Sequence, residues 1–531
     1  MEFRKFVNLG TFVNLLAGRP IVILIIIAAV LRGGALWTAF GQLHDDPDAY
    51  DAIARTLATT GTFAVVAAGD DTVPTAYRPP LYPTILAAIH RGTHRWIIAT
   101  QEDLQDPHFG GMKPVSRVAI AVLHGAMSLA TVVVTYFVAL RMLRPIAAVA
   151  VPNSQSSSDP VKLPAFFAAL LVVIDPILIQ SSVRVMTETL ATLLAVVTLY
   201  CWCRLVDKLV PEVAKKQSII TSTVSLGLVL GLAYLCRPTF IVWTALLVGC
   251  LALWSAWRFG ACLQWSRRHE TVKSVGDAGN RLSPAVAAIT LAIVASLFVG
   301  GWTLRNQKHF GKPIWATTHG GYTLLLGNNP SFFQYMRTGK TGIAWDPQPF
   351  FDRWGARDQA DPRQIEFWES EMPLPGDAVW QASVLEPQVH RELFEDRLAY
   401  ETAKMAIAND FEGFALATLW RVGRLLSPMP QVFESASIGK RIGAAVVTIY
   451  YSVTIALMIW GMFRLSRKLL QPQWIAAVML VFSLVAVHAF YWSNMRMRAP
   501  AIPALAVLAA VPLCKNNRNV ASTPLTENQP Q

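Results

Sequence analysis

Repeated apolar runs of about 20 residues constrain this chain more than any other feature of its sequence. An α-helix of that length is long enough to cross the hydrocarbon core of a bilayer. Only 15% of the 531 residues are charged, against about 25% in soluble domains, and 53% are hydrophobic. We therefore expect an all-α polytopic membrane protein. Ten spans are predicted, at residues 21–40, 117–140, 163–180, 186–206, 218–236, 238–257, 284–304, 441–463, 473–491 and 499–514.

The distribution of lysine and arginine between the connecting segments predicts how these spans are oriented. The N-terminal segment and alternate connections are basic, so we place both termini in the cytoplasm. The net charge of +12 reflects this topology and requires no nucleic-acid partner. The two long loops then face outward and carry most of the acidic residues. The chain is predicted to divide into four parts: a membrane module at 1–304 that contains the outer loop 41–116, a mostly helical outer insertion at 305–440, C-terminal transmembrane helices at 441–515 and a disordered tail at 516–531.

The cysteines argue against both a disulfide framework and a zinc site. All six lie in or beside apolar runs, and the Cys-Trp-Cys spacing at 201–203 matches no common zinc site. The apolar run after the basic N-terminus lacks a small-residue cleavage site, which predicts an uncleaved first span. The less apolar segment 411–426 is typical of an interfacial amphipathic helix.

An acidic segment directly follows the first predicted span, where acid lies unusually close to lipid. Asp46 and Pro47 form a good helix start, and Gly61 can end that helix. Asp51 and Arg55 are one turn apart and can pair. An amphipathic helix on the outer membrane surface explains this much, but it leaves Asp45 unexplained, so an active site is the alternative. The expected apolar face holds Tyr50, Ile53, Ala54, Leu57 and Ala58.

A proline-rich turn comes next, in the sequence Tyr-Arg-Pro-Pro-Leu-Tyr-Pro at 77–83. Consecutive prolines stiffen the chain and forbid a helix. A stiff turn that carries Arg78 between Tyr77 and Tyr82 could position groups on a ligand. Its alternative role is an interfacial aromatic anchor.

Together these two segments resemble the GT-C superfamily of integral-membrane glycosyltransferases, in which an outward Asp-x-x-x-Tyr helix follows the first span. The resemblance is closest to the group of protein O-mannosyltransferases, aminoarabinose transferases and bacterial dolichyl-phosphate-mannose transferase-like proteins. It continues in VRVMTETLATLL, LCRPTFIVW, RNQKHFGKPIWATTHGGYTLLLGNNP and YWSNMRMRAPAIPALAVLAA, and so covers most of the chain, although 335–440 carries none of it. The resemblance implies a GT-C-like bundle of about 10 transmembrane helices with amphipathic helices in the first outer loop.

Such a protein would be an enzyme of the bacterial inner membrane that moves a sugar from a polyprenyl-phosphate donor to an acceptor hydroxyl on the outer face. The acceptor could be a protein, a lipid or a glycan. Single displacement requires a carboxylate base for the hydroxyl and cationic groups for the departing phosphate. Aligning on Tyr50 makes Asp46 the first candidate base, followed by Asp45 and Asp48.

Glu188 is the second acidic residue at the predicted outer edge. The resemblance implies that it joins Asp46 around the acceptor or around a divalent cation, Mg²⁺ or Mn²⁺, although the sequence itself specifies no cofactor. The alternative is a helix cap at the start of the fourth span. Nearby Arg184 is expected to neutralise its charge.

Candidate ligands for the donor phosphate are Arg78, Arg237, Arg496, Arg498 and Arg32. Arg496 and Arg498 could instead bind the headgroups of bulk lipid, and Arg237 could simply mark a helix break. Arg32 lies within the first span, where it could pair with an acidic residue or extend its side chain to the outer headgroups. Candidate substrate-binding residues are Tyr50, Tyr77, Tyr82, Arg184, His319, Asn328 and Asn329.

Two other classes of function compete with sugar transfer. A secondary transporter would place polar sites at the membrane midplane, often across inverted repeats, and this chain has no visible repeat. A non-catalytic envelope-assembly protein would tolerate amide substitution of the outer acids. The expected partners are therefore the lipid-linked donor, an acceptor and membrane lipid.

Overall fold

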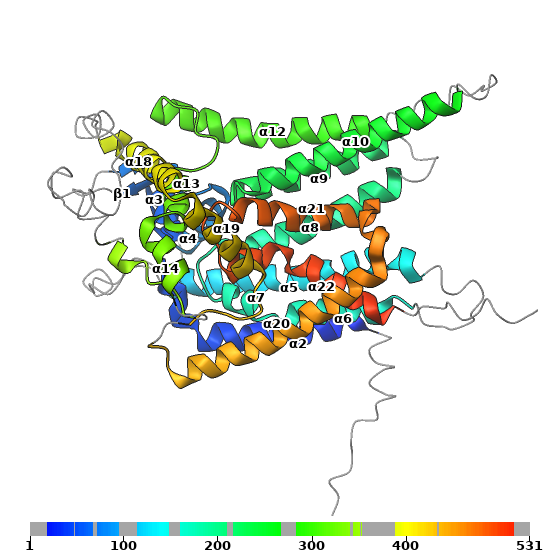
Figure 1. The fold of residues 1–531 in the computed structure, drawn as a ribbon, viewed down its shortest axis with the longest axis horizontal. Coiled ribbons are helices and arrows are strands. Elements are labelled where there is room, and N and C mark those ends of the chain that lie inside the picture. The colour runs from blue at the N-terminus through cyan, green and yellow to red at the C-terminus, as the bar shows by residue number, and fades with distance from the viewer. Residues whose placement is uncertain are drawn as a thin grey trace, which may run out of the picture.

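The computed structural model of the chain is a bundle of long helices with shorter elements gathered at one end, at the left of Figure 1. It describes residues 19–46, 48–66, 72–94, 114–147, 160–209, 216–266, 283–339, 343–350, 352, 388–432 and 435–514. The long helices are α2 (Pro20–Thr38), α5 (Pro114–Ala147), α6 (Lys162–Ile174), α8 (Glu188–Leu209), α9 (Lys216–Cys236), α10 (Phe240–Ser266), α12 (Ser283–Phe310), α20 (Ile438–Leu465) and α21 (Pro472–His488).

Within the described residues, eight helices are long and apolar enough to cross a membrane, or up to nine if a bent pair counts as one span. The bent pair is α6 and α7 (Pro176–Ser182), and the last span combines η6 (Met495–Ala501), α22 (Ile502–Ala510) and η7 (Val511–Leu513). The apolar helix α21 is shorter, at 17 residues. Each of the ten predicted spans coincides with one of these elements. The prediction of an all-α polytopic membrane fold is confirmed.

The third predicted span is broken by 52° between α6 and α7. Pro176 begins α7, where its missing amide hydrogen is not needed. Asp175 has extended backbone, and its carboxylate accepts a hydrogen bond from the Leu178 N–H at 2.9 Å. The proline and the cap together end one helix and start another. The chain can therefore turn within a few residues and lead into 183–187, just before α8.

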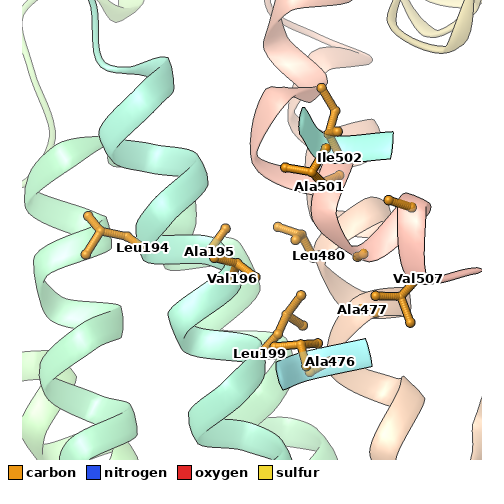
Figure 2. Close-up of a cluster of buried hydrophobic side chains, with 14 of the residues drawn as sticks. Leu194, Ala195, Val196, Leu199, Ala476, Ala477, Leu480, Ala501, Ile502 and Val507 are labelled. Atoms are coloured by element: carbon orange, nitrogen blue, oxygen red, sulfur yellow. The ribbon is translucent and has the colours of Figure 1, made fainter. Parts of the chain in front are cut away.

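Small side chains allow the central helices to pack closely. Figure 2 shows Ala195, Val196 and Leu199 of α8 on the side of Ala476, Ala477 and Leu480 of α21 and of the last span, whereas Leu194 points to the other side of α8. At Gly231 of α9, an added Cβ would lie 2.2 Å from the Phe298 ring of α12. Within a bilayer the hydrophobic effect does not drive helices together, so their association depends on such close packing.

The described parts of the segments predicted to face outward lie at the same end of the bundle, which we call the loop end. Its helices are α3 (Tyr50–Thr60), α4 (Leu81–His94), α13 (Gly320–Gly327), α14 (Pro330–Thr338), α18 (Gln388–Asn409) and α19 (Phe411–Leu426). The last of these is the helix predicted at 411–426. An aromatic cluster of Phe332, Trp345, Trp420 and Trp492 ties this insertion together. The predicted tail 516–531 lies outside the described residues.

The helix predicted after the first span forms, with one difference. It begins at Tyr50, later than expected, and the Asp46 Oδ2 atom accepts a hydrogen bond from the Ala52 N–H at 2.9 Å. Gly61 ends it at a φ of 76°, as predicted. The expected pair of Asp51 and Arg55 is present at 2.9 Å. Asp51 is also buried, and its Oδ1 lies 2.7 Å from His90 Nε2 of α4.

A two-stranded antiparallel hairpin follows, which the sequence analysis did not predict. It pairs β1 (Ala64–Val66) with β2 (Thr72–Pro74). Two side chains that are distant in the sequence hold the residues on either side of this hairpin. Arg305 of α12 donates hydrogen bonds to the carbonyl oxygens of Thr75 and Phe63, both at 2.7 Å. Glu392 of α18 accepts hydrogen bonds from the Thr75 hydroxyl at 2.7 Å and the Ala76 N–H at 2.9 Å. These hydrogen bonds therefore fix the position of the chain just before the turn that carries Tyr77 and Arg78.

Candidate active site

A cavity of about 530 Å³ lies at the loop end, where the first outer loop meets the insertion and the helix ends. Segments far apart in the sequence form its walls: 48–50, 77–79, 186–188, 237–242, 315–326 and 484–500. Eight of the predicted site residues line it, namely Asp48, Tyr50, Tyr77, Arg78, Glu188, Arg237, His319 and Arg496. We refer to it as the charged cavity.

Glu188 carries a buried negative charge that pairs with two arginines of the charged cavity. Its Oε1 atom lies 2.9 Å from Arg237 Nη2 and 2.9 Å from Arg496 Nε. The Arg237 Nε also donates to the Thr187 hydroxyl at 2.8 Å. The carboxylate is buried, while both arginines keep part of their surface open to the cavity. The prediction that Arg184 neutralises Glu188 was wrong, since two arginines from distant parts of the chain do so.

Arg78 forms the opposite wall, together with Asp48. Its Nη2 atom lies 2.9 Å from Asp48 Oδ1, and its Nε donates to the Asp48 carbonyl at 2.6 Å. The guanidinium also lies over the rings of Tyr50 and Tyr77, at 5.2 and 4.6 Å from their centroids. Cation–π contact and the paired carboxylate fix its position without hiding it from the cavity. The proline-rich turn therefore positions a cation, as its sequence predicted.

Asp46 and Asp45 differ in their surroundings. The Asp45 side chain is exposed to solvent. Asp46 is partly buried, with one oxygen engaged by the start of α3 and the other, Oδ1, buried without a hydrogen-bond partner among the described residues. Burial raises the pKa of the Asp46 carboxyl, and the nearby charge of Asp51 raises it further. Asp46 is not among the residues that line the charged cavity, but it is close enough to interact electrostatically with Arg78.

An aromatic wall closes the cavity on the side of α13. The His319 ring packs against Tyr77 at 4.6 Å and stacks on Tyr322 at 4.8 Å, measured between ring centroids. Burial and the positive charge of Arg78 hold the pKa of His319 well below its usual range, so the ring is neutral at pH 7. His319 was a predicted site residue, whereas other residues that line the cavity were not: Tyr322, Tyr400, Tyr491, Trp492 and Asn494. All of these except Tyr400 lie in segments that carry the resemblance, but nothing in the sequence marked them as site residues.

Tyr82 was predicted to bind substrate but is buried in the bundle. Its hydroxyl lies 2.8 Å from His124 Nε2, and His124 Nδ1 lies 2.9 Å from the carbonyl oxygen of Ser182. A carbonyl can only accept, so His124 Nδ1 carries the hydrogen and Tyr82 donates to Nε2. This chain of hydrogen bonds links α4, α5 and α7. The role of Tyr82 in the structure is to support these helices.

Asn328 and Asn329 are also fully buried, and neither is among the residues that line the charged cavity. Asn328 donates to the carbonyl oxygens of Leu324 and Phe490 and accepts from Arg421 Nη1 at 3.0 Å. Asn329 caps α14 by accepting from the Phe332 N–H at 2.8 Å. These side chains have no hydrogen-bonding capacity directed at a sugar. The interpretation as ordinary turn-forming residues fits their positions better than substrate binding.

Two of the five candidate phosphate ligands lie elsewhere. Arg498 is buried, donates to the carbonyl oxygens of Leu425 and Ser427 at 3.1 and 2.6 Å, and lies 4.2 Å from the Tyr451 ring centroid. Arg32 is only 2% exposed, so snorkelling to headgroups is excluded, and its Nη2 donates to the Val172 carbonyl at 2.9 Å. Neither lines the charged cavity. Arg184 lies in a second cavity, treated below.

The predicted metal site of Asp46 and Glu188 finds little support in the donor atoms. Among the described residues, no group of three or more His, Cys, Asp or Glu side chains could hold a metal ion. Glu188 is already engaged by two guanidinium groups. Cys201, Cys203, Cys236, Cys250 and Cys514 are free thiols.

Fold and cavity together define a polytopic membrane protein with a charged site at one end of its helix bundle. Residues 159–304 match the family model described as dolichyl-phosphate-mannose-protein mannosyltransferase. This segment contains Glu188 and Arg237. Over these residues the match supports the predicted resemblance to the group that contains the protein mannosyltransferases.

Comparison with solved structures found similar folds at low identity. The archaeal oligosaccharyltransferase AglB from Archaeoglobus fulgidus, in complex with an inhibitory peptide and a dolichol-phosphate, is 14% identical with a TM-score of 0.44 over 93% of this chain and 49% of that chain. ArnT from Cupriavidus metallidurans, bound to undecaprenyl phosphate, is 14% identical with a TM-score of 0.35 over 93% and 78%. The chain thus spans about half the length of the archaeal protein. A comparison with curated protein sequences found no match.

Proposed function

We propose that this protein transfers a sugar from a polyprenyl-phosphate donor to an acceptor hydroxyl in the charged cavity, by a single displacement. The observation that carries the proposal is the pairing of Arg237 and Arg496 on one buried carboxylate, with Arg78 and two aspartates nearby. Such an arrangement offers cations to a phosphate within the cavity. Asp46, which lies within electrostatic range of Arg78, is the carboxylate proposed for the hydroxyl. The family match over 159–304 supports the same reaction class.

The donor phosphate binds at Arg237 and Arg496, whose guanidinium groups remain open to the cavity. As the bond between the sugar and the phosphate oxygen breaks, charge develops on the leaving prenyl phosphate. The fixed arginines stabilise that charge without having to reorganise. Arg78, held by Asp48 and by two tyrosine rings, adds a third positive charge on the opposite wall.

Asp46 is the proposed general base. A base is most effective when its pKa lies near the working pH, and burial raises the pKa of Asp46. Its free Oδ1 can accept the proton from the acceptor hydroxyl while Oδ2 stays bound to the start of α3. The hydroxyl oxygen attacks the anomeric carbon on the face opposite the phosphate, so the sugar inverts. Asp48 lines the cavity but is paired with Arg78, which makes it the weaker base.

We place the reaction on the outer face of a bacterial inner membrane, with both termini in the cytoplasm. The support is the excess of lysine and arginine in the segments at the end of the bundle opposite the charged cavity. Dependence on Mg²⁺ or Mn²⁺ stays a prediction, and no step above is assigned to a metal ion.

The test is sugar transfer by purified protein from a panel of radiolabelled polyprenyl-phosphate sugars, with host membrane extract as acceptor. Asp46→Asn keeps the shape of the side chain and most of the helix cap but cannot act as a base. We expect it to lower the rate of transfer by at least about 100-fold with donor binding unchanged. Asp45→Asn is the matched control, since that side chain is exposed, and should leave transfer intact.

Two results would redirect the assignment. If Asp46→Asn transfers normally and Asp48→Asn does not, the base is Asp48. If the wild-type protein transfers from no donor in the panel, sugar transfer is rejected in favour of transport or envelope assembly, and solute flux in proteoliposomes becomes the next measurement.

A further inference from the structure

A second, larger cavity of about 1380 Å³ lies beside the charged cavity. Its walls come from α7, α19, α20 and the segment 344–347. Trp492, Asn494 and Arg496 line both cavities, so these three residues form the partition between them. A ligand in the second cavity is thereby adjacent to Arg496, one of the two arginines that hold Glu188.

The charged groups of the second cavity are all cationic. They are Arg184, Arg424, Lys440 and Arg496, and no aspartate or glutamate is among the described residues that line it. The described part of the chain offers no carboxylate within ion-pair distance of Arg184, Arg424 or Lys440. Four cations that line one cavity with no carboxylate among its described lining residues favour the binding of an anion.

Arg424 is held for such a role. Its guanidinium lies between the rings of Trp420 and Trp492, 4.8 Å from each centroid. The Nη1 atom is buried and has no hydrogen-bond partner within the described ranges. Stacking on two rings orients the planar group while leaving its hydrogens free for a phosphate. The arrangement is a built site and not a solvated surface charge.

The remaining walls are apolar and reach the outside of the bundle. Ile177, Leu416, Leu419 and Val447 are among the apolar residues that line the cavity. Leu419 is 72% exposed and Met429 is 43% exposed, at the side where the outward face of α20 carries further large apolar residues. In a membrane protein, a cavity wall of this kind faces lipid chains and not water.

We propose that the second cavity binds the acceptor and that the acceptor is a phosphorylated membrane lipid. This inference rests on the proposed function. The phosphate lies at Arg424, Lys440 and Arg184, the acyl chains lie along the apolar wall, and a headgroup hydroxyl extends past Arg496 into the charged cavity. There its oxygen forms the new bond to the sugar, its proton goes to Asp46, and prenyl phosphate departs with the bonding electrons.

Two glycines on α20 allow the second cavity to be filled without touching the first. Gly443 lines the second cavity, and an added Cβ there meets nothing within 4 Å. Gly439, one turn earlier on the same helix, has the same freedom but is not among the lining residues. Gly443→Trp should therefore block the cavity, and Gly439→Trp is its matched control. Arg424→Gln removes the central charge while both tryptophans remain.

The first measurement is retention of dioleoylphosphatidic acid and dioleoylphosphatidylcholine by the full-length protein in native mass spectrometry. We expect the wild-type protein and Gly439→Trp to retain phosphatidic acid preferentially. Gly443→Trp and Arg424→Gln should retain it at least roughly tenfold less well. Binding of prenyl phosphate to the charged cavity, measured separately, should be unchanged in all four proteins.

Three outcomes would overturn the proposal: equal retention of the two lipids, unchanged retention of phosphatidic acid in Gly443→Trp, or displacement of the phospholipid by a soluble acidic peptide. Because lipid retention does not depend on turnover, these outcomes are distinguishable from failure of sugar transfer itself. If phosphatidic acid binds as expected but no sugar is transferred, from any donor that the protein uses, to phosphatidylglycerol, whose headgroup carries free hydroxyls, the cavity is a lipid site and the acceptor assignment is wrong.

Discussion

At the scale of single residues, Glu188 has an uncommon position, since one buried carboxylate oxygen is shared by two arginines. Glu188→Gln removes the charge and keeps the shape. We expect the unliganded variant to lose about 2 kcal/mol of folding free energy, because two partly buried cations then face each other uncompensated. A prenyl phosphate restores the negative charge, so it should raise the thermal unfolding midpoint more in the variant than in the wild type.

The control for this experiment is Glu395→Gln, whose carboxylate pairs with Arg391 on the exposed surface of α18. Its response to prenyl phosphate should equal that of the wild type. An equal response from Glu188→Gln would mean that the phosphate does not bind at this pair of arginines.

We predict that the stability of the insertion depends on pH because of Asp396. Burial raises the pKa of its carboxyl to about 6, although it accepts a hydrogen bond from the Gly321 N–H at 2.6 Å. The folded state therefore binds more protons than the unfolded chain between about pH 4 and 6, and stability falls as pH rises through this range. The carboxyl is partly exposed, so we expect a loss on the order of 1 kcal/mol.

Hydrogen exchange of peptides from α13 and α18 at pH 4.5 and 7 measures this effect. The wild-type peptides should exchange faster at pH 7, after correction for the intrinsic rate. Asp396→Asn should remove the difference while protection of the central helices stays the same. A difference that persists in the variant would assign it to another group.

The residue types of the site could be predicted, but their partners could not. The acidic cluster, the Arg-Pro-Pro turn and Glu188 stand out because charge and proline are rare next to apolar runs. Glu188 pairs with Arg496, which is 308 positions away, and no local pattern encodes a pairing at that distance. Asn328 and Asn329 show the converse error, since polar side chains in a glycine-rich segment can satisfy buried backbone groups as well as bind a sugar.

At the scale of elements, the close contact of α9 with α12 depends on Gly231, where a Cβ would lie 2.2 Å from the Phe298 ring. Gly231→Ala should separate these helices and lower stability by about 1–3 kcal/mol. Gly249→Ala on α10 is the control, because an added Cβ there meets nothing within 4 Å. Thermal unfolding in detergent measures both. If the clash is the cause, Phe298→Ala should recover part of the loss when combined with Gly231→Ala.

The break between α6 and α7 supports the partition from within the bundle. Both oxygens of Asp175 accept from the Tyr451 hydroxyl, at 3.0 and 2.9 Å, and Arg498 stacks over the ring of Tyr451. Arg498 is two residues from Arg496. Tyr451→Phe removes the hydrogen bond and should lower stability by about 1 kcal/mol. It should also weaken donor binding through Arg496. Tyr450→Phe should not, because the Tyr450 hydroxyl donates to the Leu171 carbonyl and its ring has no contact with Arg498 among the described residues.

Helix positions followed from hydropathy, whereas the irregular elements did not. The ten apolar runs predict their spans because bilayer thickness fixes the length of each helix. The hairpin of β1 and β2 was missed because each strand has only three residues and its support comes from Arg305 and Glu392, outside the local sequence. The start of α3 shifted to Tyr50 because Ala49 takes a left-handed conformation, with φ of 58°, which its residue type does not favour.

At the scale of the whole molecule, both cavities lie at the end of the bundle that we predict to face outward. In a variant whose six native cysteines are replaced by serine, Thr72→Cys places a thiol at an exposed position of the loop end. Arg467→Cys places one at the opposite end, in η5 (Ser466–Leu470). An impermeant maleimide added to intact spheroplasts should label the first and not the second, and the reverse pattern would invert the topology.

Because Thr75 and Ala76 are held by Arg305 and Glu392, the site can form only late in the synthesis of the chain. Arg305 and Glu392 are made 230 and 317 residues after Thr75, so the ribosome has added most of the chain before the turn carrying Arg78 can be anchored. A nascent or truncated chain that has inserted its first spans therefore exposes the acidic helix without a formed site. If the insertion lies outside, as we propose, the charged cavity can form only after the insertion has crossed the membrane, so a partly assembled molecule would lack the proposed transfer activity.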